Sequence, residues 1–160
     1  MPAEENCHFE IFLNLPRDKA FALLADHLSA WWLAVAPGGG VRDKVQDAGL
    51  EPHAGGVCYE ITANHGHLVW GTVLSIERPL YIRLAWQVTS DGKPIRDSAA
   101  ASRVMISLRE AAGGTRLELV HTDFIRHGED AQASLEAARG EGGWPARLAS
   151  LQAAAATTRF

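Results

Sequence analysis

Cysteine and long apolar runs are both scarce in this sequence. Two cysteines, Cys7 and Cys58, among 160 residues are too few for a disulfide scaffold and fit a reducing compartment. The most apolar stretch, FALLADHLSAWWLAVA at 21–36, is interrupted by Asp26 and His27 and is too short to cross a bilayer. The first residues, MPAEENCHFE, carry acids and lack the apolar segment of a signal peptide. These absences predict a cytoplasmic protein that does not insert into membranes.

An excess of basic residues is also missing. The chain has 15 Lys and Arg against 19 Asp and Glu, its formal net charge is −4, and the basic residues are scattered. Nucleic-acid binding is therefore not expected, because phosphate neutralisation would dominate such an affinity. Hydrophobic residues make up 47% of the chain, and the length fits one domain over residues 1–160 with a single core.

Motifs for nucleophilic catalysis and for cofactor binding are absent. The sequence has no G-x-S-x-G elbow, no P-loop and no G-x-G-x-x-G after a strand. The glycines at 38–40 and 55–56 read as loops, because neither group opens a convincing helix. Glu129 and Asp130 suit the first turn of a helix, where acids favour the dipole. We therefore predict no cofactor and no cysteine or serine nucleophile.

The first third of the chain predicts one strand followed by helix. CHFEIFLNL (7–15) alternates, with apolar residues on one face and Phe12 as the exception. Pro16 then suits the first turn of a helix over the following residues. Ser29 is positioned to cap a second short helix holding Trp31 and Trp32, which the glycines at 37–40 would end.

From residue 41 to residue 124 the hydrophobic period is mostly two. Strands are predicted at 41–49, 55–64, 67–77, 80–88, 102–110 and 115–124, with a tight turn at 111–114. The strand at 80–88 would place Leu80, Ile82, Leu84, Trp86 and Val88 on one face. The pattern then turns helical at 129–139 and again from Pro145, where Trp144, Leu148 and Leu151 have helical spacing. Antiparallel strands with helices gathered on one side predict an α+β domain whose sheet curls around the last helix.

Several segments resemble a known family when taken together. They are the early WW, EPHAGGVCYE, WGTVLSIERPLYIRLAW, GGTRLELVHTDF, and GGW followed by RLASL, in that order. The chain resembles the activator of heat-shock protein 90 ATPase homologue family, within the START-like, SRPBCC (birch-pollen-allergen-like) superfamily. This resemblance implies the helix-grip fold: a curved antiparallel sheet of about six to seven strands around a long C-terminal helix, two short helices after the first strand, and often an apolar cavity.

The resemblance leaves the function open. The superfamily includes lipid and sterol carriers, plant hormone receptors, aromatase/cyclase enzymes and chaperone regulators, and a fold does not choose among them. Eukaryotic chaperone activators carry an additional N-terminal domain that contributes to chaperone binding. This chain begins almost directly with the first predicted strand, so the family name alone is a weaker guide here than the residues of the site.

The strand at 115–124 carries the most informative polar residues. Its alternation places Leu117, Leu119, His121 and Asp123 on one face, so a histidine and an acid are expected along the interior. His121 and Asp123 then form either an acid/base pair or ligand-binding group in a cavity, or a core histidine bonded to Asp123 or to a backbone carbonyl. The second interpretation is favoured, and catalysis is the weaker expectation.

Aromatic residues supply the other candidates for a ligand site. Trp32, Trp70, Trp86 and Trp144 are expected to line an apolar pocket, with Tyr59 offering a hydroxyl group and His121 a further polar group. Such tryptophans can equally be plain core residues.

His65 and His67 lie two apart in NHGHLVW. Asn64 and Gly66 both tolerate the positive φ of a tight hairpin, so a turn is favoured over half of a metal site. We predict no metal. The leading hypothesis is a binding protein for a small apolar or amphipathic molecule. The alternatives are a chaperone ATPase regulator, and a cofactor-free cyclase or hydrolase using His121 and Asp123. The oligomeric state, including a homodimer, is left open.

Overall fold

A curled antiparallel sheet organises the molecule. The computed structural model describes residues 6–35 and 45–158. Its seven strands follow the order β1-β7-β6-β5-β4-β3-β2, and every neighbouring pair is antiparallel. The strands are β1 Cys7–Leu13, β2 Val45–Leu50, β3 Val57–Thr62, β4 Gly66–Glu77, β5 Tyr81–Trp86, β6 Ser102–Ala111 and β7 Gly114–Thr122.

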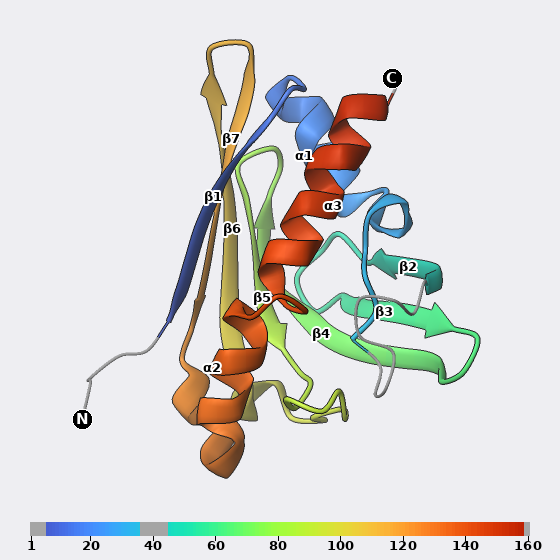
Figure 1. Ribbon diagram of the computed structural model, residues 1–160, viewed down its shortest axis with the longest axis vertical. Coiled ribbons are helices and arrows are strands. Elements are labelled where there is room, and N and C mark those ends of the chain that lie inside the picture. The colour runs from blue at the N-terminus through green and yellow to red at the C-terminus, as the bar shows by residue number, and fades with distance from the viewer. Residues whose placement is uncertain (1–5, 36–44, 159–160) are drawn as a thin grey trace.

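The helices gather on one side of this sheet. Figure 1 shows α3, the last helix, running across the sheet, with α1 near its C-terminal end and α2 near its start. The helical elements are α1 Arg17–Ala25, η1 Leu28–Ala30, η3 Ser98–Ala100, η4 Phe124–Asp130, α2 Ala131–Arg139 and α3 Trp144–Thr157. The stripe predicted for the last helix is confirmed, because Trp144, Leu148 and Leu151 are all buried in the main core.

Irregular pairing bends the sheet on the side of β2 to β5. The register shifts between Val45 and Asp47, between Cys58 and Tyr59, and between Val73 and Ser75. An extra residue in one strand of a pair bends that strand and increases its twist. Three such shifts in consecutive pairs help the sheet to curl toward α3.

The predicted turn between the last two strands is confirmed. β6 ends at Ala111, β7 begins at Gly114, and these two residues pair across the turn. Gly113 has φ of 81°, a conformation that glycine adopts without steric cost.

Two local predictions were wrong. The second short helix is only the three-residue η1, which ends before the tryptophans: Trp31 caps it and Trp32 lies beyond it. The glycines at 37–40, predicted to end that helix, fall outside the described residues. Leu80 is 42% exposed, because β5 begins at Tyr81 and Leu80 belongs to the turn that precedes the strand.

Candidate functional site

Four of the predicted site residues meet in the core between sheet and α3. Trp32 stacks on Trp70 with ring centroids 4.2 Å apart, and Trp86 lies 5.4 Å from Trp70 and 5.2 Å from Trp144. All four rings are buried. Aromatic pairs at these separations stabilise a core beyond the effect of buried area alone. The tryptophans therefore fill much of the space between the sheet and α3.

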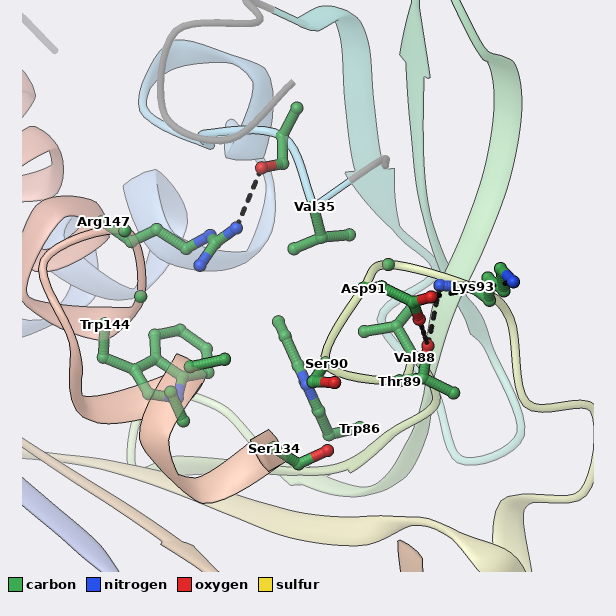
Figure 2. Close-up of a pocket in the computed structure, with 16 residues that line it drawn as sticks. Val35, Trp86, Val88, Thr89, Ser90, Asp91, Lys93, Ser134, Trp144 and Arg147 are labelled. Atoms are coloured by element: carbon green, nitrogen blue, oxygen red, sulfur yellow. Dashed lines mark hydrogen bonds and ion pairs between the residues drawn. The ribbon is translucent and has the colours of Figure 1, made fainter. Parts of the chain in front are cut away.

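A cavity of about 560 Å³ remains beside this cluster. Trp86 and Trp144 line it, whereas Trp32 and Trp70 are not among its lining residues. Figure 2 shows the two lining tryptophans beneath Arg147, with the loop that follows β5 on the opposite side. The volume falls in the range typical of small-molecule sites. Trp86 and Trp144 thus border the cavity. Trp32 and Trp70 pack against Trp86 without lining the cavity.

The loop after β5 is fixed to the helical side of the cavity. The Asp130 carboxylate accepts hydrogen bonds from Ser90 N at 2.7 Å, Ser90 Oγ at 2.6 Å and Ser134 Oγ at 2.6 Å. Burial alone would raise the pKa of Asp130, but the hydrogen bonds from Ser134 and Ser90 lower it overall. Asp130 is therefore held as a carboxylate that ties this wall of the cavity to the start of α2.

Tyr59 lies away from the cavity, which corrects the sequence-based expectation. Its hydroxyl group donates to Asp47 Oδ2 at 3.4 Å, and its ring stacks on His67 with centroids 5.5 Å apart. Within β3, Cys58, Glu60 and Thr62 are the buried residues, so Tyr59 points to the other face. Tyr59 instead borders a separate open groove beside β2.

Glu60 is the residue that the sequence reasoning missed on this strand. Its side chain is completely buried, and Oε1 accepts hydrogen bonds from Trp32 Nε1 at 2.8 Å and from Val35 N at 2.9 Å. Strand alternation did contain the signal, because Glu60 shares a face with Cys58. The other face of the strand carries Val57, Tyr59 and Ile61. These residues are more apolar, so hydrophobicity alone favours the wrong face as the buried one.

Arg147 is the second residue that was missed. It is 4% exposed and donates from Nε to Leu33 O at 2.9 Å and from Nη2 to Ala34 O at 3.0 Å. Its guanidinium carbon lies 4.9 Å from the centre of the Trp32 ring. Burial lowers the pKa of Arg147 to about 10, and the charge of Glu60 opposes this shift. Arg147 has helical spacing from Trp144 and Leu151, which is a signal for burial, but its charge argued for solvent.

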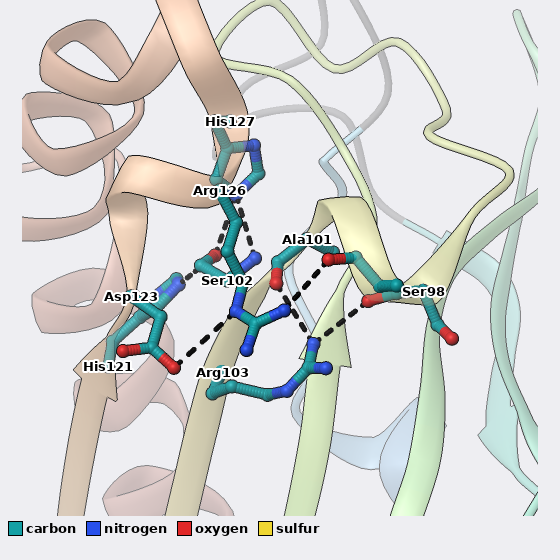
Figure 3. Close-up of polar contacts among 9 residues, drawn as sticks. Ser98, Ala101, Ser102, Arg103, His121, Asp123, Arg126 and His127 are labelled. Atoms are coloured by element: carbon teal, nitrogen blue, oxygen red, sulfur yellow. Dashed lines mark hydrogen bonds and ion pairs between the residues drawn. The ribbon is translucent and has the colours of Figure 1, made fainter.

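His121 is buried as predicted, with partners other than those expected. Trp144 Nε1 donates to His121 Nδ1 at 3.0 Å, and His121 Nε2 lies 2.7 Å from Ser102 Oγ. A neutral histidine has one donor and one acceptor nitrogen, so Nε2 must carry the proton and donate to Ser102. The Ser102 hydroxyl group then donates to His127 Nε2, 2.7 Å away. Figure 3 shows Ser102 between His121 and His127.

The interior placement of Asp123 was wrong. β7 ends at Thr122, and Asp123 has φ of 63°, which breaks the alternation of the strand. Its half-exposed carboxylate faces Arg126, with 3.6 Å between Oδ2 and Nε, as Figure 3 shows. His121 is meanwhile fully buried with both ring nitrogens occupied. This arrangement favours the core role for His121 over an acid/base pair with Asp123.

Burial makes His121 a source of acid sensitivity. Desolvation, and next the proximity of His127, lower the pKa of His121 to about 3 from the ordinary 6.5. The unfolded chain therefore binds a proton that the folded protein excludes, so stability is complete above pH 6.5 and falls as the pH drops toward 3. We expect this residue to contribute a loss of about 2 kcal/mol in the free energy of unfolding between pH 7 and pH 5.

Urea denaturation of His121→Gln at both pH values checks this expectation. Glutamine keeps a donor and an acceptor but does not titrate, so the variant should lose less stability on acidification than the native protein. His65→Gln is the matched control, since His65 is exposed at the β3–β4 turn. An unchanged pH dependence in His121→Gln would show that another group is responsible.

The predicted hairpin at His65 and His67 is confirmed. Both side chains are exposed, and Gly66 has φ of 65° at the tip. Among the described residues, the only His, Cys, Asp and Glu side chains close enough together to share a metal ion are His8, Glu10 and Glu118, on the outer face of β1 and β7. His8 Nε2 already lies 2.5 Å from Glu118 Oε2 there. His65 and His67 therefore belong to a turn, and the absence of a metal stays a prediction.

The two cysteines are unsuited to nucleophilic chemistry. Cys7 and Cys58 are both free and buried. Desolvation raises the pKa of each thiol, and a buried thiol with a raised pKa is a poor nucleophile. In the described parts of the chain, no helix has both the length and the apolar character needed to cross a membrane.

The seven-stranded curled sheet closed by a C-terminal helix defines the helix-grip fold. The chain matches the family described as Activator of Hsp90 ATPase homolog 1-like protein over residues 14–156. It therefore belongs to this family, as the resemblance predicted. No curated protein matches the chain.

Solved structures share the fold at low sequence identity. The anthrahydroquino-γ-pyrone synthase Txn09 is 23% identical, with a TM-score of 0.67, over 96% of this chain and 99% of that one. NE0264 from Nitrosomonas europaea is 16% identical, with a TM-score of 0.69, over 99% of both chains. MLL2253 from Mesorhizobium loti is 20% identical, with a TM-score of 0.67, over 97% and 99%. At these identities the likeness shows the fold alone.

Proposed function

We propose that this protein binds a small amphipathic molecule in the cavity between the sheet and α3. The observation that carries the proposal is the lining itself, in which Trp86 and Trp144 supply apolar surface while Arg147 and Ser90 supply polar groups. A concave site with apolar and aromatic walls and a few polar groups is the usual form of a small-molecule site. The similarity of the fold to Txn09, a protein named as an anthrahydroquino-γ-pyrone synthase, supports a small-molecule site.

Replacing Trp86 tests the proposal directly. Trp86→Ala removes a wall of the cavity, so we expect the affinity for 1-aminoanthracene, a neutral fluorescent aromatic probe, to fall by about tenfold or more. Fluorescence titration measures the affinity, and thermal unfolding measures the accompanying loss of stability.

Trp31→Ala is the matched control. Trp31 is equally buried and packs against Trp32, but it does not line the cavity. We expect this variant to lose stability while its affinity for the probe stays within about threefold of the native value. If the two variants lose affinity in proportion to their loss of stability, or if the native protein does not bind the probe, the proposal fails.

Membership of the family favours one alternative, regulation of a chaperone ATPase through protein–protein contact. This function predicts that excess protein changes the ATPase rate of a purified Hsp90-type chaperone, independently of the cavity. An unchanged rate would reject it. Trp86→Ala separates the two functions, because a regulator acting through its outer surface would keep its effect in this variant.

A further inference from the structure

Arg147 has hydrogen-bonding capacity that the described residues do not use. Its guanidinium group has five N–H donors. Arg147 donates hydrogen bonds from Nε to Leu33 O and from Nη2 to Ala34 O. No described residue accepts a hydrogen bond from Nη1. Arg147 borders the cavity, and Figure 2 shows its guanidinium group between Val35 and Trp144.

The surroundings of this cation are aromatic. Its guanidinium carbon lies 4.9 Å from the Trp32 ring centre, 5.9 Å from that of Trp86 and 6.0 Å from that of Trp144. Ring faces attract a cation but accept no ordinary hydrogen bond. Glu60 supplies a compensating charge, although its oxygens accept from Trp32 and Val35. Nη1 thus remains a donor without an acceptor among the described residues, at the edge of the cavity.

The charges that line the cavity do not cancel. They belong to Asp91, Lys93 and Arg147. Lys93 Nζ lies 3.7 Å from Asp91 Oδ2, so these two exposed groups neutralise each other at the mouth. The remaining charge of the lining is the buried guanidinium group of Arg147.

We propose that the ligand is a planar aromatic acid whose anionic oxygen accepts a hydrogen bond from Arg147 Nη1. This inference rests on the proposed function of the cavity and specifies the chemical class that it takes. The aromatic part packs against Trp86 and Trp144, and the acid accepts a hydrogen bond from the unused Nη1 donor. A charge-assisted hydrogen bond is stronger than a neutral one, and arginine favours planar oxyanions. The volume of about 560 Å³ accommodates a molecule of two or three fused rings.

Two probes of the same shape test this class. 2-Naphthoate carries the carboxylate, whereas 2-naphthamide has the same rings and a neutral amide. Isothermal titration calorimetry on the native protein at pH 7.5 should give an affinity for the acid at least about tenfold higher. Arg147→Met, which removes the charge and the donors, should abolish this preference while leaving the affinity for the amide within about threefold. Lys93→Met is the matched control and should retain the preference.

The outcomes distinguish the proposal of an aromatic acid from the proposal that the cavity binds a small molecule. Equal affinities for acid and amide in the native protein overturn the aromatic acid and leave cavity binding intact. The same holds if 1-aminoanthracene binds and both naphthalene probes fail. Failure of all three probes rejects both proposals. If Arg147→Met does not fold, the native comparison together with Lys93→Met decides: loss of the preference in Lys93→Met would assign the anion to the mouth and overturn the role of Arg147.

Discussion

Replacing Glu60 by alanine is expected to lower the free energy of unfolding by about 3–5 kcal/mol. The carboxylate is completely buried, and it accepts the indole N–H of Trp32 and the backbone N–H of Val35. Its removal leaves both donors unpaired in the core. It also removes the negative charge that stabilises the buried cation of Arg147. Urea denaturation monitored by circular dichroism measures the loss.

Two further variants separate charge from hydrogen bonding at this position. Glu60→Gln keeps an acceptor oxygen but loses the charge, so an intermediate loss of about 1–3 kcal/mol is expected. Glu77→Ala, at the exposed end of β4, is the control and should change stability by no more than about 0.5 kcal/mol. A loss below about 1 kcal/mol in Glu60→Ala would mean that water or a rearranged chain satisfies the two donors.

Trp144→Ala is expected to cost about 3–5 kcal/mol, the range for truncating a buried large aromatic residue. Trp144 is 2% exposed at the start of α3, where it packs on Trp86 and donates a hydrogen bond to His121 Nδ1. The variant loses this packing and also leaves the acceptor nitrogen of a buried histidine unpaired. Equilibrium unfolding in urea measures the difference.

Trp144→Phe isolates the hydrogen bond, because it keeps most of the ring and removes the N–H group. We expect a loss of about 1–3 kcal/mol in this variant. Phe12→Ala, at an exposed aromatic residue of β1, is the control and should cost less than about 1 kcal/mol. If Trp144→Phe is as stable as the native protein, the bond to His121 contributes nothing, and the burial of His121 has another basis.

The fold was predictable because it depends on period and order. Strands such as β6 and β7 bury one face, and alternation reveals such a face without knowledge of its partner. Trp144, Leu148 and Leu151 marked the buried side of the last helix in the same way. Alternation does not reveal where a strand begins or ends. Leu80 lies just before β5 and Asp123 just after β7, yet both were assigned to a face of the strand.

The site was only partly predictable because two of its buried residues are charged, and hydrophobicity places charged residues at the surface. Glu60 and Arg147 are charged, and a single sequence gives no reason to bury a charge until its partners are known. Those partners come from elsewhere in the chain: Trp32 and Val35 approach Glu60, and the carbonyl groups of Leu33 and Ala34 approach Arg147. Tyr59 was placed at the site because its hydroxyl group suits a ligand pocket, but Cys58, Glu60 and Thr62 are the buried residues of β3.

The sequence by itself determined the family, the sheet of antiparallel strands, the long last helix and the burial of the tryptophans and His121. The family follows from the resemblance of several segments in a fixed order, and the other properties follow from local spacing, which the chain carries at every residue. Only the tertiary structure decided which tryptophans border a cavity, which residues hold His121, and that Glu60 and Arg147 lie inside. Such features depend on contacts between segments that are far apart in the chain, and the free energy of burying a charge is set by those contacts.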